Sequence, residues 1–185
     1  MPESATIEND RTRIAIVEGV FEPELCRWLL DQSRRLFFSG QGFQASSARW
    51  DRRVVEDSKP VQIHDLPADA GALLIGHLRA RDMLGPGEAH AMLYAWEHGS
   101  YIPWHDDGHH GGGAVTVYLN DRWDAEWGGH FLYRTPEGVV AEPVVPRFNR
   151  GVRNGSALLH GTTVVENAAP EPRFTLQVFS RGLVS

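Results

Sequence analysis

The chain has 185 residues, of which 42% are hydrophobic and 23% charged, and these values are typical of one globular domain. The net charge of −6 argues against nucleic acid as a partner, because phosphate binding requires a concentrated basic surface. The only cysteine, Cys26, excludes an internal disulfide and a zinc–thiolate site. No apolar run is long enough for a membrane span or a signal peptide, so we expect a cytoplasmic protein without a membrane partner.

The N-terminal region predicts a tail followed by one domain. Residues 1–12 are polar and carry mixed charges, which indicates a flexible tail. Residues 13–185 are expected to form a single domain, with a β core over about residues 88–182. The apolar run at residues 14–17 predicts a short first strand.

Two helices are predicted in the first half of the chain. The first begins at Pro23, because proline suits the first position of a helix. Its apolar residues recur on one face, which should pack against a sheet; they are Leu25, Trp28, Leu29 and Leu36. The second helix is expected at about residues 67–84, where Gly85-Pro86-Gly87 ends it. Residues 39–62 between them are predicted to be irregular.

After residue 87 the pattern changes to short strands separated by Gly, Asn, Asp and Pro turns. The clearest strand-like runs are residues 89–97, 114–120, 129–134, 155–160 and 173–180. Short strands at this spacing are typical of a jelly roll, or double-stranded β-helix. The predicted fold class is therefore α+β, mainly β, with the N-terminal helices packed on the outside of one sheet.

The His-x-Asp motif formed by His105 and Asp107 is a candidate metal site. With one residue between them, both side chains project to the same side of an extended backbone, while Asp106 should face away. His160, at the end of the run 156–160, supplies a second imidazole. Two imidazoles and one carboxylate on one face of an ion leave other positions open, as in the facial triad of non-haem Fe(II) oxygenases.

Arg173, on the last predicted strand, is a candidate ligand for an anion. The period of two in a strand places Arg173, Thr175 and Gln177 on one face, and the intervening apolar residues on the other. A cation on the inner face of a β core needs a partner, because an unpaired buried charge is costly. Guanidinium binds carboxylates with paired hydrogen bonds, so the distal carboxylate of 2-oxoglutarate would fit here.

Residues 90–180 resemble the prolyl-hydroxylase branch of the Fe(II)/2-oxoglutarate-dependent oxygenases, especially the hypoxia-factor-type and other prolyl 4-hydroxylases. Several short segments carry the resemblance: Tyr94, Gly99 and Tyr101 ahead of the His-x-Asp motif, and residues 117–124, 128–129, 136–138 and 146–150, with Arg173 opening an alternating strand. The resemblance implies a jelly-roll enzyme that binds Fe(II), 2-oxoglutarate and O₂, with ascorbate as a candidate reductant.

The same resemblance implies a reaction and a set of site residues. 2-Oxoglutarate and O₂ would be converted to succinate and CO₂ while an unactivated C–H bond is hydroxylated. The iron ligands would be His105, Asp107 and His160. Two groups of residues would bind the cosubstrate: Tyr118 and Arg173 at its distal carboxylate, and Tyr94 and Thr175 along its pocket. The related halogenases have a small residue in place of the aspartate, so Asp107 favours hydroxylation over halogenation, while desaturation or ring formation stays open.

The substrate is predicted only by class. A free amino acid or small metabolite, proline-like in shape, is the first expectation, and a prolyl or other residue of a peptide or protein is the alternative. Candidate substrate residues are Arg49, Trp50, Arg52 and Trp123, although the arginines also suit a solvated face and Trp123 also suits hairpin packing. The segment 49–51 loosely resembles an Arg-Gly-Asp segment of prolyl hydroxylases but lacks the central glycine.

Three further histidines and two other classes of protein compete with this interpretation. His109, His110 and His130 are rival metal ligands, although their positions in a glycine-rich loop and at a strand start suit other roles. A non-catalytic jelly-roll module could hold a structural metal, but it would need no dicarboxylate clamp. A zinc hydrolase would need a general-base glutamate, and none accompanies the motif. The sequence does not indicate an oligomeric state.

Overall fold

The computed structural model describes residues 12–46, 59–135 and 137–181. Within these ranges lie two α-helices, α1 (Pro23–Phe38) and α3 (Ala68–Ala80), and two 3₁₀ turns, η3 (Gly108–His110) and η4 (Ala125–Trp127). The strands in chain order are β1 (Ile14–Val17), β2 (Gln44–Ala45), β3 (Gln62–Asp65), β4 (Ala89–Trp96), β5 (Gly111–Tyr118), β6 (Phe131–Tyr133), β7 (Gly151–Asn154), β8 (His160–Thr162) and β9 (Arg173–Arg181).

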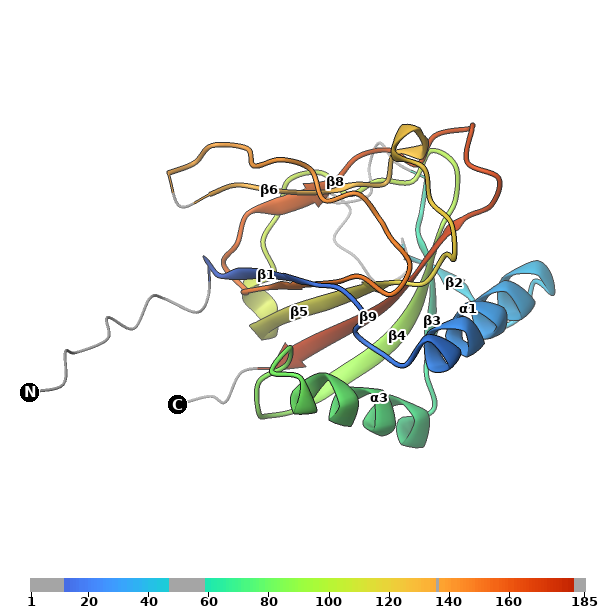
Figure 1. The fold of residues 1–185 in the computed structure, drawn as a ribbon, viewed down its shortest axis with the longest axis horizontal. Helices are drawn as coiled ribbons and strands as arrows, with labels where there is room; N and C mark the ends of the chain where they lie inside the picture. The colour runs from blue at the N-terminus through green and yellow to red at the C-terminus, as the bar shows by residue number, and fades with distance from the viewer. Residues whose placement is uncertain (1–11, 47–58, 136, 182–185) are drawn as a thin grey trace, which may run out of the picture.

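The strands form two antiparallel sheets that face each other (Figure 1). The large sheet has seven strands in the order β1-β7-β5-β9-β4-β3-β2, and the small sheet pairs β6 with β8. Both long central strands, β4 and β5, pair with β9, which places the last strand of the chain in the middle of the large sheet. This is the arrangement predicted for a jelly roll, and the first strand has the predicted bounds.

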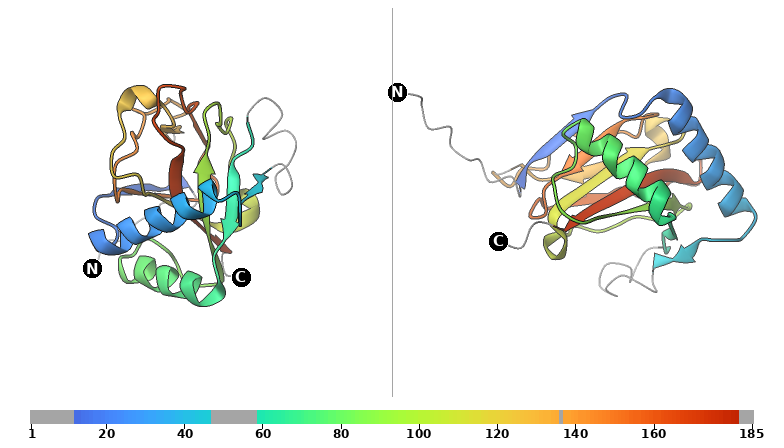
Figure 2. Two further views of the ribbon diagram at one scale, coloured as in Figure 1. Left: turned by 90° about the vertical axis from the view of Figure 1, so that its right-hand side faces the viewer. Right: turned by 90° about the horizontal axis from the view of Figure 1, so that it is seen from below.

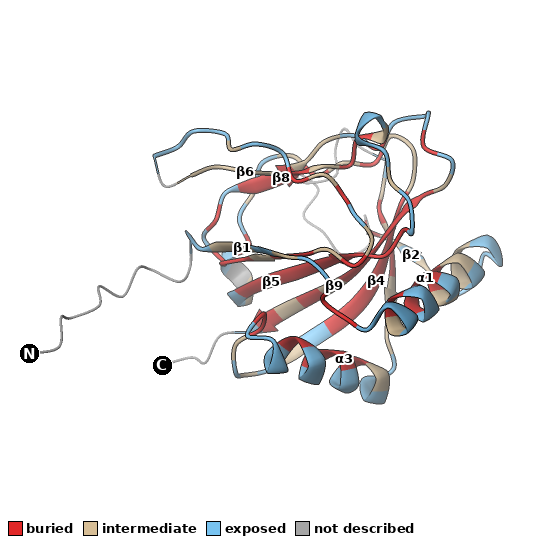
Figure 3. Cartoon of the chain, in the orientation of Figure 1, coloured by how far each residue is buried: buried red, intermediate tan, exposed pale blue. Residues whose placement is uncertain are grey.

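Helices α1 and α3 cover the outer face of the large sheet, on the side away from the small sheet (Figures 1 and 2). The main apolar core lies between these helices and the sheet (Figure 3). Leu29 of α1 and Leu78 of α3 are fully buried there, together with Leu176 of β9. Phe174, Leu176 and Val178 of β9 therefore face the helices, as the alternation predicted. Arg173 and Gln177 line the cavity on the opposite face, together with Phe179. None of the described helices combines the length and apolarity needed to cross a bilayer.

Two predictions about the helices are wrong in detail. Trp28 was expected on the buried face of α1, but it is 51% exposed, because the buried stripe runs through Cys26, Leu29 and Ser33. At 3.6 residues per turn, Trp28 lies on the face of the helix opposite that stripe. The second helix ends at Ala80 rather than near residue 84, since the chain turns at Asp82, whose φ is +54°.

The strand predicted at residues 155–160 is also wrong. Residues 155–159 form the turn between two strands, because β7 ends at Asn154 and β8 begins at His160. The buried side chain of Leu158 lies in that turn and explains the apolar signal. The region predicted to be irregular, residues 39–62, contains β2, and β3 begins at its last residue.

Candidate active site

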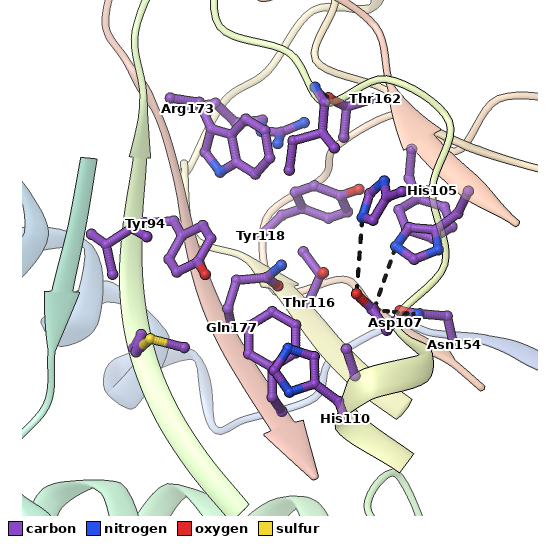
Figure 4. Close-up of a pocket in the computed structure, with 18 of the residues that line it drawn as sticks. Tyr94, His105, Asp107, His110, Thr116, Tyr118, Asn154, Thr162, Arg173 and Gln177 are labelled. Carbon is purple, nitrogen blue, oxygen red and sulfur yellow. Dashed lines mark hydrogen bonds and ion pairs between the residues drawn. The ribbon is translucent and has the colours of Figure 1, made fainter. Parts of the chain in front are cut away.

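A cavity of about 660 Å³ lies between the two sheets (Figure 4). Its floor is the inner face of β4, β9 and β5, and residues opposite each other on these strands form rows across it. The rows are Trp96–Arg173, then Tyr94–Thr175–Tyr118, then Met92–Gln177–Thr116. Phe131 of β6 and Thr162 of β8 contribute to the cavity wall from the small sheet. The pairing register of β4, β9 and β5 therefore determines which side chains lie next to one another on the cavity floor.

Three side chains of the ligand type meet at one side of the cavity, and we call them the His–Asp–His cluster: His105, Asp107 and His160 (Figure 4). One nitrogen or oxygen atom from each lies within 4.8 Å of those of the other two, which is close enough for one metal ion. Nε2 of His160 is 3.5 Å from Oδ2 of Asp107, and Nε2 of His105 is 3.9 Å from Oδ1. A pair of backbone hydrogen bonds between the two histidines, 2.8 and 2.9 Å long, holds their chain segments together.

Backbone carbonyls orient both imidazole rings. Nδ1 of His105 is 2.8 Å from the carbonyl oxygen of Pro103, and Nδ1 of His160 is 2.8 Å from that of Leu158. Because a carbonyl only accepts, each Nδ1 carries a proton, and in a neutral imidazole Nε2 then presents its lone pair on the side of Asp107. Burial lowers the pKa of His160, and the Asp107 charge opposes that shift only in part. Both rings are thus held in the tautomer that ligates a metal through Nε2.

Asn154, at the end of β7, holds the carboxylate of the cluster. Its Nδ2 donates a hydrogen bond to Oδ2 of Asp107 over 3.1 Å, and both residues are buried. Pairing of Asn154 with Ala114 of β5 places it beside the cavity. No sequence motif marks Asn154 as part of the site, because only the register of a distant strand brings it to Asp107.

Of the other acidic and histidine candidates, none whose side chain the structure describes belongs to the cluster. Asp106 is exposed and its carboxylate accepts a hydrogen bond from the Gly108 N–H over 2.9 Å. His110 lines the cavity, but its ring stacks on Phe179 with a centroid distance of 4.2 Å. His130 does not contribute to the cavity wall among the described residues. The side chain of His109 lies outside the part that the structure describes.

Arg173 lies across the cavity from Asp107 (Figure 4). We call Arg173 and the two rings beside it, those of Trp96 and Tyr118, the arginine end. Arg173 is 1% exposed, and burial lowers its pKa to about 10, which still leaves it charged at neutral pH. Nη1 donates to the carbonyl of Gly129, while Nε has no hydrogen-bond partner among the described residues. A buried guanidinium with an unused N–H group suits a carboxylate ligand.

The remaining cosubstrate candidates differ in what their side chains contact. Tyr94 and Tyr118 are buried and line the cavity. Burial raises the pKa of Tyr118, with the Arg173 charge opposing it, so its phenol stays protonated and can donate to an anion. Thr175 stands between Tyr94 and Tyr118 in the second row, but it is not among the residues that line the cavity. Its hydroxyl accepts a hydrogen bond from Nε1 of Trp96 over 3.2 Å.

Of the predicted substrate residues, only Trp123 is among those that the structure describes. It lies in hairpin packing and not in the cavity wall: its Nε1 donates to the Gly128 carbonyl over 2.9 Å and its ring packs edge-on against Trp127. The positions of Arg49, Trp50 and Arg52 lie outside the described residues.

The donor atoms at the two ends of the cavity fit different ligands. Two imidazoles with free Nε2 atoms and one carboxylate are suited to a divalent transition metal with open coordination positions, such as Fe(II). The buried cation of the arginine end, with Tyr118 beside it, is suited to the far carboxylate of a dicarboxylic acid. Because both ends open on one cavity, one molecule could contact both.

Comparison with known proteins gives a family and several similar structures. A family model described as the 2OG-Fe(II) oxygenase superfamily matches residues 89–181, which are 93 of the 185 residues. The comparison with curated proteins finds no significant match.

Among solved structures, a Pseudomonas putida prolyl-4-hydroxylase is 18% identical, with a TM-score of 0.70 and 91% of each chain covered. A Trichoplax adhaerens prolyl hydroxylase, solved with a peptide of hypoxia inducible factor, is also 18% identical, with a TM-score of 0.71 over 91% of this chain and 83% of that one. The α-ketoglutarate-dependent epimerase SnoN of nogalamycin biosynthesis is 15% identical, with a TM-score of 0.61 over 92% and 79% of the two chains. These likenesses confirm the predicted jelly-roll fold.

Proposed function

From the premise that this chain belongs to the 2OG-Fe(II) oxygenase superfamily, we propose that it hydroxylates an unactivated C–H bond of a free amino acid or small metabolite. As a member of that family, it is a dioxygenase that uses Fe(II), 2-oxoglutarate and O₂. One observation carries the proposal: the His–Asp–His cluster and the buried Arg173 face the same cavity. Membership in an oxygenase family favours an enzyme over a structural metal-binding module or a zinc hydrolase.

In this proposal the His–Asp–His cluster holds the iron, while Arg173 and Tyr118 hold the distal carboxylate of 2-oxoglutarate. Iron and 2-oxoglutarate together supply the oxidation, in which O₂ is consumed, the cosubstrate becomes succinate and CO₂, and one oxygen atom goes to the substrate. The carbonyls that accept from the two Nδ1 atoms keep both histidines ready to bind the metal. The hydrogen bond from Asn154 to Oδ2 fixes the orientation of the Asp107 carboxylate within the cluster.

The protein also has to shape the space for a substrate and keep water away. A volume of about 660 Å³ is within the usual range for small-ligand pockets, roughly 300–1,000 Å³, and exceeds what one five-carbon dicarboxylate fills. Ile63, Met92 and Phe179 give part of the wall an apolar surface. A compact, largely apolar group such as a pyrrolidine ring or an aliphatic side chain would fit beside the cosubstrate.

A prolyl or other residue within a peptide is the second candidate substrate, and one observation favours it. The described cavity wall contains one guanidinium, that of Arg173, and the cosubstrate would occupy it. A free amino acid brings a carboxylate that needs a further cation, whereas a residue inside a peptide does not. Two of the similar folds belong to prolyl hydroxylases, one of them solved with a peptide.

The proposal is tested by measuring succinate from purified protein with Fe(II), 2-oxoglutarate and ascorbate. Free amino acids, including proline, would be compared with proline-containing peptides whose two ends are blocked. We expect slow succinate formation alone, faster formation with a substrate, and a product heavier by one oxygen atom. Stimulation by blocked peptides alone would select the second candidate. Absence of 2-oxoglutarate binding at millimolar concentration would overturn both candidates.

A further inference from the structure

The guanidinium of Arg173 is a buried cation whose neighbours are aromatic rather than acidic. Its central carbon lies 4.1 Å from the ring centroid of Trp96 and 5.7 Å from that of Tyr118. The described residues supply no carboxylate to it, and its one hydrogen bond among them goes to the carbonyl of Gly129. A charge at 1% exposure would be costly without partners, and the two rings and the Gly129 carbonyl are the partners that stabilise it among the described residues.

Trp96 is itself fixed by its strand and by one hydrogen bond. It is the last residue of β4, it is paired directly with Arg173 of β9, and it is 2% exposed. Its Nε1 donates to the hydroxyl of Thr175, two residues along β9 from the arginine. The hydroxyl of Thr175 therefore orients the Trp96 ring, and this ring in turn covers one face of the Arg173 guanidinium.

An aromatic neighbour has a consequence that an acidic one would not have. A carboxylate beside Arg173 would occupy its N–H groups and would repel an incoming anion. A ring stabilises the cation through its face and leaves the edge of the guanidinium, where the N–H groups point, for a ligand. Stacking also limits rotation of a long side chain, so less freedom is lost when a carboxylate binds.

We propose that Trp96, oriented by Thr175, is a positioning residue that holds Arg173 ready for the distal carboxylate of 2-oxoglutarate. The inference rests on the proposed cosubstrate site and adds two residues to it that act through the arginine. It also gives Thr175 a role at the cosubstrate site without direct contact to the cavity.

The test compares two ligands that chelate the metal in the same way. 2-Oxoglutarate has a distal carboxylate and oxalate has none, so only the first should depend on Arg173. Binding of each would be measured without oxygen in the Fe(II)-loaded protein by isothermal titration calorimetry, which needs no chromophore. Trp96→Leu should weaken 2-oxoglutarate about tenfold and change oxalate less than about twofold. Trp96→Phe, which keeps a ring, should recover most of the loss.

Two gentler variants and one control complete the experiment. Thr175→Val removes the hydroxyl without changing the volume and should weaken 2-oxoglutarate about threefold, while Thr175→Ser should bind like wild type. Trp127→Leu is the control, because Trp127 packs against the apolar cluster that contains Trp96 but has Arg122 as its cationic neighbour. Its ratio of 2-oxoglutarate to oxalate affinity should equal that of the wild type.

The outcomes separate this inference from the proposed function. If wild type binds 2-oxoglutarate and a folded Trp96→Leu keeps the wild-type ratio of the two affinities, the inference is wrong and the function stands. If both ligands weaken by the same factor, Trp96 only maintains the pocket and the inference is again wrong. Should Trp96→Leu fail to fold, an unchanged ratio in Thr175→Val would overturn it. Failure of wild type to bind 2-oxoglutarate would overturn the function itself.

Discussion

At the His–Asp–His cluster each side chain is oriented by a hydrogen bond, whereas at the arginine end the cation lies between aromatic rings with Nε unpaired. The partners of the two histidines are carbonyls only two residues earlier in the chain. The rings beside Arg173 come from β4 and β5, which pair with β9 on either side. Local backbone contacts thus orient the two histidines of the cluster, whereas the pairing register of the strands places the rings beside Arg173.

This difference suggests a division of labour that mutations can separate. A metal ion needs ligand atoms held to within fractions of an ångström, and hydrogen bonds with fixed directions supply that. A carboxylate needs a cation with unused N–H groups. The rings of Trp96 and Tyr118, which form an aromatic cage, stabilise the Arg173 guanidinium without occupying those groups. Variants at the cluster should therefore change metal binding and turnover, and variants at the arginine end should change the affinity for 2-oxoglutarate.

The largest effect is expected for Asp107→Ala. Loss of the only carboxylate in the cluster should lower Fe(II)-dependent succinate formation by about 1,000-fold or more, because two imidazoles alone hold the metal poorly. Asp106→Ala is the matched control, since its carboxylate caps Gly108 and lies outside the cluster. Equal losses in the two variants, measured as initial rates with saturating iron, would contradict the assignment of Asp107.

Arg173→Ala should have the next largest effect. Removing the guanidinium should raise the KM for 2-oxoglutarate about 100-fold, which corresponds to roughly 3 kcal/mol, while affinity for Fe(II) stays near that of the wild type. Arg181→Ala, at the exposed end of the same strand, should leave both quantities unchanged. An unchanged KM in Arg173→Ala would show that the cosubstrate binds elsewhere.

The two ends also differ in how far the sequence could predict them. The pair His105 and Asp107 is marked by its spacing, because alternate residues of an extended segment share a side. Arg173 is marked by the alternation of β9, which places a charge on the face opposite the core. Both signals are local, so they survive without knowledge of the tertiary structure.

Contacts between strands that are distant in sequence could not be predicted in this way. Asn154 meets Asp107, and Trp96 meets Arg173, only because particular strands pair in one register. His160 was predicted as a ligand at the end of a strand, whereas it begins β8, because apolar residues in the preceding turn imitate a strand. Trp28 was predicted to share the buried face of α1 with Leu25, Leu29 and Leu36, but at 3.6 residues per turn it lies opposite the buried stripe.

Asn154→Ala is the third prediction and tests a contact that the sequence did not indicate. Loss of the hydrogen bond to Asp107 should weaken Fe(II) binding by about 10-fold, because partners that orient metal ligands typically contribute 10- to 100-fold. The ratio of 2-oxoglutarate to oxalate affinity should not change, since both ligands chelate the same metal. A shift in that ratio without loss of iron affinity would show that the two ends are not independent.

Gly129→Ala should have the smallest effect, confined to the arginine end. The residue has a φ of +65°, and a Cβ there would lie 3.1 Å from Cδ and Nη1 of Arg173. Gly40→Ala is the matched control, with a φ of +67° and no atom within 4 Å of the added Cβ. Both variants should lose about 1 kcal/mol of unfolding free energy through backbone strain. Only Gly129→Ala should also weaken 2-oxoglutarate, about fivefold, because the methyl group displaces the guanidinium. Equal 2-oxoglutarate affinities in the two variants would mean that the position of Arg173 tolerates such a displacement, and that the aromatic cage matters less than its geometry indicates.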